Sequence, residues 1–208
     1  MPPLFLSLDG IDGTGKSTQC RLLADWLRAR GQAVLECADP GGTPIGDVLR
    51  GLLLDHRREM TLACEAFLFL ASRAQLVAEV IRPALAAGQI VVSDRYLLAN
   101  VVYQGHAGGI DPALLWDMGR LATGGLLPDL TLVLDLPVEQ ALRRRGRTAD
   151  RMERRDLAYQ ERVRQGFLLE VQRQPERIRV IDARPPLAEV QENIRREVTR
   201  VLEARPRA

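Results

Sequence analysis

The chain has 208 residues, of which 46% are hydrophobic, 27% charged and 4% aromatic, so its composition excludes a disordered or collagen-like protein. A formal net charge of +2 excludes the general basic field of a nonspecific nucleic-acid binder. Three scattered cysteines and two histidines predict neither a disulfide scaffold nor a zinc site. Because the sequence has no basic leader segment and no run of about 18 apolar residues, we expect a reduced, cytoplasmic protein without a membrane segment.

Strand and helix patterns alternate along the chain. Five apolar runs predict strands at Leu4–Leu8, Ala33–Cys37, Gln89–Ser93, Leu130–Leu136 and Ile178–Ile181. Helical patterns cover Lys16–Arg30, Gly46–Asp55, Thr61–Ala87, Asp111–Ala122, Val138–Arg145, Asp150–Gln172 and Leu187–Ala204. Pro83 predicts a kink or an early end in the third of these helices. Strands that alternate with helices predict crossover connections, and therefore an α/β fold with a parallel sheet.

The junction between the first strand and the first helix carries a motif. Residues 10–17 read Gly-Ile-Asp-Gly-Thr-Gly-Lys-Ser, which matches the phosphate-loop pattern G-x-x-x-x-G-K-[ST]. Glycines let successive N–H groups point at a polyphosphate, and the helix N-terminus adds partial positive charge. Lys16, the single lysine among 29 basic residues, is expected at the β- and γ-phosphates, and Ser17 at Mg²⁺. The alternative is a Gly-rich turn without a ligand.

Two classes of phosphate-loop protein are excluded by what the sequence lacks. A GTPase needs an Asn-Lys-x-Asp motif to read its base, and the only lysine is already in the phosphate loop. The Ser-Gly-Gly-Gln signature of ABC-type ATPases does not occur. Switch GTPases and transport ATPases are therefore ruled out.

Three further segments follow the loop in order: Asp39–Thr43 (Asp-Pro-Gly-Gly-Thr), Glu65–Gln75, and Ser93–Gly105 with its Asp-Arg-Tyr and Tyr-Gln-Gly. Together with the phosphate loop, these segments resemble the bacterial thymidylate kinases over nearly the whole chain. The resemblance implies a three-layer P-loop NTPase fold, in which helices flank a five-stranded parallel sheet. It implies one kinase domain over 1–208, with a short Arg-rich lid at about 143–155. It also implies transfer of the γ-phosphate of ATP to dTMP with Mg²⁺, in a homodimer without a nucleic-acid or membrane partner.

The motif and the resemblance together assign the site residues. The donor site comprises Gly10, Ile11, Asp12, Gly13, Thr14, Gly15, Lys16, Ser17, Thr18 and Arg143. The acceptor site comprises Asp39, Arg50, Phe69, Arg73, Arg95, Asn100, Tyr103 and Gln104. The residues assigned to Mg²⁺ are Ser17 and Asp94, and those assigned to catalysis are Asp12, Lys16, Arg95 and Arg147.

The base of the acceptor is expected between two helical faces. Phe69 and Arg73 are four residues apart and share a face if helical, and the resemblance implies that they stack on thymine and hydrogen-bond it. Asn100, Tyr103 and Gln104 repeat this spacing and would read the thymine edge and press on the sugar. The alternatives are a Phe69 that belongs to the core and a Tyr103 that only packs.

The acceptor phosphate is expected beside a strand end. Asp94 and Arg95 follow an apolar strand, where open α/β sheets place their ligand crevice. By resemblance, Asp94 assists Mg²⁺, and Arg95 and Arg50 hold the acceptor phosphate. The alternatives are a buried Asp94–Arg95 ion pair and an exposed helical Arg50.

Phosphoryl transfer also needs a cation over the moving oxygens. Gly13 stands where some thymidylate kinases have a loop arginine, so the lid is expected to provide it. The candidates are Arg143, Arg144, Arg145, Arg147, Arg151, Arg154 and Arg155, of which we favour Arg147, with Arg143 and Arg151 as rivals. The alternatives are a solvated helix with paired charges and a nucleic-acid surface, which the lack of interleaved aromatic residues disfavours.

Four positions depart from the family pattern. Asp9 stands for the usual Glu, Ala38 and Asp39 for the usual Arg-Glu, and Ala99 for a usual Ser. These changes bear on the acceptor and the rate more than on the fold. Two other functions therefore stay open: a kinase of another pyrimidine monophosphate, and a nucleotide-binding regulator with weak turnover.

Overall fold

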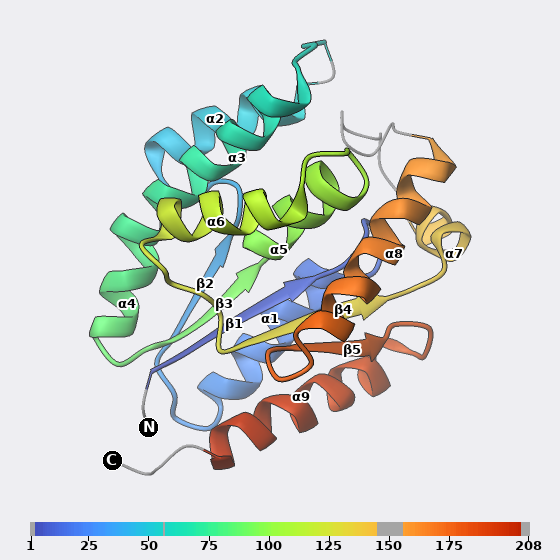
Figure 1. The fold of residues 1–208 in the computed structure, drawn as a ribbon. Coiled ribbons are helices and arrows are strands. Elements are labelled where there is room, and N and C mark those ends of the chain that lie inside the picture. The colour runs from blue at the N-terminus through green and yellow to red at the C-terminus, as the bar shows by residue number, and fades with distance from the viewer. Residues whose placement is uncertain (1–2, 56, 145–155, 205–208) are drawn as a thin grey trace.

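The computed structural model describes residues 3–55, 57–144 and 156–204, and a five-stranded parallel sheet forms its centre (Figure 1). The strands are β1 (Leu4–Asp9), β2 (Val34–Ala38), β3 (Ile90–Asp94), β4 (Leu130–Asp135) and β5 (Ile178–Asp182). Their order in the sheet is β2-β3-β1-β4-β5. All five predicted strands are confirmed, and each boundary differs from the prediction by at most one residue.

Helices cover both faces of the sheet, so its strands are buried on both sides (Figure 1). On one face, α1 (Lys16–Arg28) packs beside α9 (Leu187–Ala204). Leu4, Leu6 and Leu8 of β1 join the core cluster that contains these two helices, whereas Phe5 joins a second cluster with the helices between β2 and β4. This alternation confirms the expected three-layer α/β architecture.

The remaining helical elements belong mainly to the opposite face. They are α2 (Pro44–Leu54), α3 (Leu62–Leu76), η1 (Val77–Ile81), α4 (Arg82–Ala86), α5 (Leu97–Asn100), η2 (Val101–His106), α6 (Pro112–Thr123), α7 (Val138–Arg144) and α8 (Leu157–Arg173). Side-chain caps start several of them: Thr43 accepts from the Gly46 N–H at α2, and Asp156 from the Tyr159 N–H at α8. The part of the predicted 150–172 helix that precedes Asp156 lies outside the described residues.

Two π-helical turns, η1 and η2, are the features of the helices that the sequence pattern did not predict. The predicted Thr61–Ala87 helix runs from Leu62 to Ala86, but η1 widens it just before Pro83, which lies in the first turn of α4. An early end at Pro83 is therefore wrong, because the first turn of a helix does not require the missing N–H. The second π turn, η2, continues α5.

The strand order decides where a ligand can lie. β1 pairs with β3 on one side and with β4 on the other, so the crossovers diverge from it and leave a crevice at the carboxyl edge. Leu8 pairs with Asp94, and Asp94 with Ala38, which brings the ends of β1, β2 and β3 together.

Candidate active site

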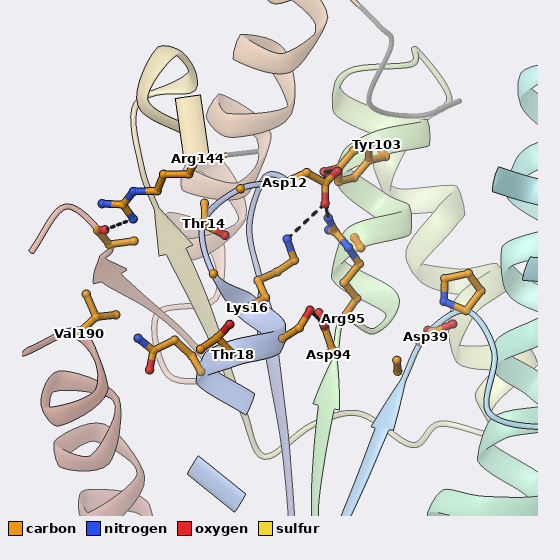
Figure 2. A pocket seen from close by; sticks show the side chains of 18 of the residues that line it. Asp12, Thr14, Lys16, Thr18, Asp39, Asp94, Arg95, Tyr103, Arg144 and Val190 are labelled. Atoms are coloured by element: carbon orange, nitrogen blue, oxygen red, sulfur yellow. Dashed lines mark hydrogen bonds and ion pairs between the residues drawn. The ribbon is translucent and has the colours of Figure 1, made fainter. Parts of the chain in front are cut away.

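A cavity of about 940 Å³ opens at this carboxyl edge (Figure 2). Sixteen of the predicted site residues line it: Asp12, Gly13, Thr14, Gly15, Lys16, Ser17, Thr18, Asp39, Arg50, Phe69, Arg73, Asp94, Arg95, Asn100, Tyr103 and Gln104. Gly10 and Ile11 are buried at the start of the loop and do not line the cavity, and Arg143 is exposed on α7 without lining it. Arg147, the favoured lid arginine, and its rival Arg151 lie outside the described residues.

The phosphate loop of this chain has a backbone shape and close contacts that favour glycine. Gly13 has a φ of +91°, and a Cβ built there would lie 2.2 Å from the Ala141 carbonyl oxygen. A Cβ on Gly10 would likewise lie 2.5 Å from the Leu134 carbonyl oxygen. α1 begins directly after Gly15 and has no acidic residue in its first turn, so its positive end faces the cavity.

The ammonium group of Lys16 is held by the loop itself. Lys16 Nζ donates to the Ile11 carbonyl oxygen at 2.9 Å and lies 3.4 Å from Asp12 Oδ1. Burial lowers the pKa of Lys16, and the nearby Arg95 acts in the same direction. A polyphosphate at this point would give the buried ammonium group the anionic partner that it only partly has in Asp12.

Arg95 joins the two halves of the cavity. Its φ of +71° turns the chain away from the end of β3, and its guanidinium donates to Gly10 O at 3.1 Å and Asp12 Oδ1 at 2.5 Å. It also donates to the Tyr103 hydroxyl at 3.2 Å. Lys16 and Arg95 therefore converge on the Asp12 carboxylate, as Figure 2 shows. The alternative, an Asp94–Arg95 ion pair, is wrong, because Arg95 pairs with Asp12.

Asp94 contacts the first turn of α1 instead. Its Oδ2 accepts a hydrogen bond from Ser17 Oγ at 2.5 Å. A hydroxyl and a carboxylate are oxygen ligands of the kind that Mg²⁺ takes beside phosphate and water. The pair predicted for the metal thus lies together, next to the loop, and its chemistry fits the ion.

The acceptor side contains a buried ion pair. Arg73 Nε donates to Asp39 Oδ2 at 2.5 Å, and its Nη1 donates to Asn100 Oδ1 at 3.1 Å. Phe69, one turn earlier on α3, is half-buried at the cavity wall and belongs to neither core cluster. Arg50 is exposed on α2 but also lines the cavity, where it donates to Pro40 O at 2.6 Å.

One region of the wall was missed by sequence reasoning. The loop between β5 and α9, residues 183–186, lines the cavity together with Leu187 and Val190 of α9. Arg144, expected only as one of the lid candidates, lines it as well. Arg144 donates to Ala183 O at 2.9 Å, and Gln19 of α1 donates to Leu187 O at 3.1 Å. The helical phase of α7 thus places Arg144, not its neighbour Arg143, at the cavity. The signal available was position: Asp182 ends a strand of the same sheet, as Asp94 does.

Three of the four departures from the family pattern, Ala38, Asp39 and Ala99, line the cavity, and the fourth is Asp9. Asp9 is fully buried at the end of β1, and neither of its carboxylate oxygens has a hydrogen-bond partner among the described residues. Burial raises the pKa of Asp9 to about 7. Asp39 pairs with Arg73, and Ala38 and Ala99 both line the cavity without a polar side-chain group.

A phosphate loop at the end of the central strand, with cations and amides across the crevice, defines a P-loop nucleotide-binding phosphotransferase. The thymidylate kinase family model matches residues 8–194. The thymidylate kinase of Rhodopirellula baltica is 50% identical over 93% of this chain and 79% of its own length. That of Symbiobacterium thermophilum is 45% identical over 97% and 95%. The crystal structure of thymidylate kinase from Ehrlichia chaffeensis superposes with a TM-score of 0.80 at 27% identity, over 96% of this chain and 99% of that one.

The chain therefore belongs to the thymidylate kinase family, the ATP-dependent phosphotransferases of dTMP. Both the predicted family and the predicted fold are confirmed. Among the described residues, no helix is long and apolar enough to cross a lipid bilayer.

Proposed function

We propose roles for the cavity residues in the transfer of the γ-phosphate from ATP to dTMP. The observation that carries the proposal is the convergence of Lys16 and Arg95 on Asp12, at the centre of the cavity. Lys16 lies on the phosphate-loop side and Arg95 on the side of α3 and η2, so the two cations flank the path between donor and acceptor. Asp12 occupies the place where anionic oxygens of the substrates would be stabilised.

The donor is held by main chain and by one lysine. N–H groups of residues 13–18 face the polyphosphate, with Lys16 at its β- and γ-phosphates. The donor base extends toward the other end of the cavity, between Arg144, Val190 and the loop after β5. Ser17 and Asp94 would hold Mg²⁺, which when bound neutralises the phosphate charge that develops during transfer.

The acceptor lies on the opposite side. Arg95 and Arg50 hold its phosphate, whose own oxygen is the nucleophile, so no strong general base is required. Phe69 stacks on the thymine ring, and Tyr103 presses on the sugar. Arg73, Asn100 and Gln104 hydrogen-bond the thymine edge, and the ion pair with Asp39 holds Arg73 in place.

Closure of the site requires one further cation. We assign it to the lid at about 143–155, with Arg147 as the first candidate and Arg143 and Arg151 as rivals. Replacing Arg147 by Ala should lower kcat by about 10³-fold, the size of effect typical of arginines on transferring phosphoryl groups. The affinity for dTMP, measured by calorimetry, should change less than threefold. An unchanged kcat would move the role to Arg143 or Arg151.

The functional unit is proposed to be a cytoplasmic homodimer of one kinase domain over 1–208. Large apolar side chains are exposed on three helices that lie along one side of the molecule in Figure 1, namely Ile45 and Val48 of α2, Phe67 of α3, and Leu114 and Leu121 of α6. A second copy would cover them. Light scattering of the purified chain measures this directly, and a monomer at micromolar concentration would contradict it.

A coupled ADP-release assay tests the activity. Turnover with ATP should be fastest for dTMP when dTMP, dUMP, UMP, dCMP and dGMP are compared. Thymine differs from uracil by one methyl, worth about 1–3 kcal/mol in a pocket, so dUMP should react more slowly but measurably. A faster rate with another monophosphate would favour a kinase of that nucleotide. Tight binding of ATP and dTMP without dTDP formation would favour a regulator.

A further inference from the structure

A chain of buried polar side chains runs along the acceptor side of the cavity and ends outside it. Its members, with their exposed fractions, are Asp39 (3%), Arg73 (1%), Asn100 (2%), Gln104 (1%) and Glu65 (1%). The first four line the cavity, whereas Glu65 lies behind Gln104 and is not among the lining residues. No part of the proposed function uses this last carboxylate.

The hydrogen bonds that link these side chains all run in the same donor-to-acceptor direction, from Arg73 to Glu65. Starting from the guanidinium of Arg73, Nη1 donates to Asn100 Oδ1 at 3.1 Å. Asn100 Nδ2 then donates to Gln104 Oε1 at 2.7 Å, and Gln104 Nε2 donates to Glu65 Oε1 at 2.7 Å. Both amide oxygens therefore point toward the cation, and both amide nitrogens point toward the carboxylate.

The two charged ends make this orientation the only satisfied one. If Gln104 were reversed, its oxygen would face the Glu65 carboxylate and its NH₂ would face the NH₂ of Asn100. A carboxylate accepts hydrogen bonds but does not donate them, so both contacts would be unpaired. Buried unsatisfied groups each destabilise a fold by about 1–3 kcal/mol. Glu65 thus fixes Gln104, and Gln104 fixes Asn100.

The helix α3 places the fixing groups. Glu65, Phe69 and Arg73 follow at intervals of four residues, so one face of α3 carries both charged ends of the amide pair and the ring between them. Glu65 lies in the first turn of the helix, four residues after the Thr61 cap. A single rigid element therefore sets the direction of the amides of Asn100 on α5 and Gln104 on η2.

We propose that Glu65 is a positioning residue that determines selectivity for the pyrimidine edge. By fixing Asn100 and Gln104, it leaves the cavity with one set of free amide donors and acceptors. Thymine presents an N3–H donor and an O4 acceptor, whereas cytosine presents an N3 acceptor and an N4 donor. A wall with fixed polarity suits one base and leaves its own groups unpaired against the other. The inference rests on the proposed function, in which these amides read a pyrimidine monophosphate.

Replacing Glu65 by Gln tests this positioning role. A glutamine side chain has the same shape as glutamate but can pair with Gln104 in either of its amide orientations. The measurement is kcat/KM for dTMP, dUMP and dCMP. The dUMP:dCMP ratio isolates the base edge, and the dTMP:dUMP ratio isolates the methyl group. We expect Glu65→Gln to lower the dUMP:dCMP preference at least tenfold, while the dTMP:dUMP ratio and the KM for ATP stay within twofold. A proportional loss for all three acceptors would indicate a structural role only and would overturn the proposal.

Two further variants serve as controls. Glu79→Gln changes a carboxylate on η1, farther along the same helical segment, where Glu79 accepts a hydrogen bond from Gln75 at the surface. Both ratios and the KM for ATP should match wild type. Glu65→Asp keeps the carboxylate and should retain at least a third of the wild-type dUMP:dCMP preference, which a requirement for shape alone would not predict.

The double variant Glu65→Gln with Gln104→Glu covers the case in which the single variant does not fold. It keeps a donor opposite an acceptor across the buried pair, but position 104 then offers the cavity no donor. Its dUMP:dCMP preference should also fall at least tenfold, and an unchanged preference overturns the proposal. The proposed function fails separately, if wild type phosphorylates none of the three pyrimidine monophosphates.

Discussion

The donor half and the acceptor half of the cavity are built from different groups. On the donor side, the phosphate loop and the start of α1 line the cavity with residues 12–18, among which Lys16 is the one cation. On the acceptor side, side chains from the end of β2 and from α3, α5 and η2 meet in a buried network. Backbone N–H groups recognise charge that all nucleoside triphosphates share, whereas oriented side chains distinguish bases. The comparison indicates that substrate selectivity belongs mainly to the acceptor half.

The largest expected effect comes from Lys16, the cation of the phosphate loop. Lys16→Met should lower kcat about 10³-fold, because the charge on the transferring phosphoryl group loses its fixed partner. The affinity for dTMP, measured by calorimetry, should change less than threefold, since the acceptor network is intact. A kcat within tenfold of wild type would contradict this role.

The same lysine offers a chemical test. Since Lys16 is the only side-chain amine in the chain, an amine-directed reagent should inactivate the protein, and ATP with Mg²⁺ should protect it. The protection should appear as reduced labelling of the phosphate-loop peptide in mass spectrometry. Full activity after stoichiometric labelling of that peptide would show that the donor half does not depend on this amine.

In the acceptor half, breaking the buried ion pair should act on stability. Arg73→Met leaves Asp39 buried without its partner and should lower the free energy of unfolding by about 3–5 kcal/mol. Adding Asp39→Leu should recover most of that loss, because no unpaired charge then remains. Arg200→Met removes an exposed arginine paired with Glu197 and serves as the matched control, with a loss below about 1 kcal/mol. Urea unfolding measures all three, and equal losses for Arg73 and Arg200 would refute the contrast.

A smaller effect tests whether the loop acts through its shape. Gly13→Ala places a Cβ against the Ala141 carbonyl and should lower kcat/KM for ATP about 100-fold. Gly31 has a similar positive φ of +76° but has open space around it, outside the cavity. Gly31→Ala should therefore lower stability by about 1 kcal/mol and leave the kinetics unchanged. If both variants had similar kinetics, the Cβ clash at Gly13 would have no effect on catalysis, and the loop would not act through its shape.

The smallest effect concerns pH. The raised pKa of Asp9, about 7, means that the folded state keeps a proton that the unfolded chain loses near its ordinary pKa of 3.8. Stability from this group is therefore present at low pH and is lost as the pH rises toward 7. Asp9→Asn should gain about 2 kcal/mol over wild type between pH 5 and pH 8, measured by urea unfolding at both values. A difference that does not change with pH would contradict the assignment.

The sequence predicted the donor half of the cavity from a local motif, but the acceptor half only through a family resemblance. The motif at residues 10–17 located the donor half because the loop, the strand before it and the helix after it are contiguous, and its glycines have a local steric reason. The acceptor residues were assigned one by one through a family resemblance, and they do line one cavity. Their mutual contacts were not predicted: Arg73 was expected on the base but also pairs with Asp39, and Arg95 with Asp12 rather than Asp94.

The sequence by itself determined the alternation of strands and helices, the phosphate loop and its single lysine, because apolar periodicity and glycine geometry act over a few neighbouring residues. The tertiary structure alone decided which carboxylate meets which arginine, that Arg144 rather than Arg143 reaches the cavity, and that Glu65 ends the amide chain. The contacts Arg73–Asp39, Glu65–Gln104 and Arg95–Asp12 join residues 34, 39 and 83 positions apart. The order in which parallel strands pair sets such contacts, and no local pattern encodes that order.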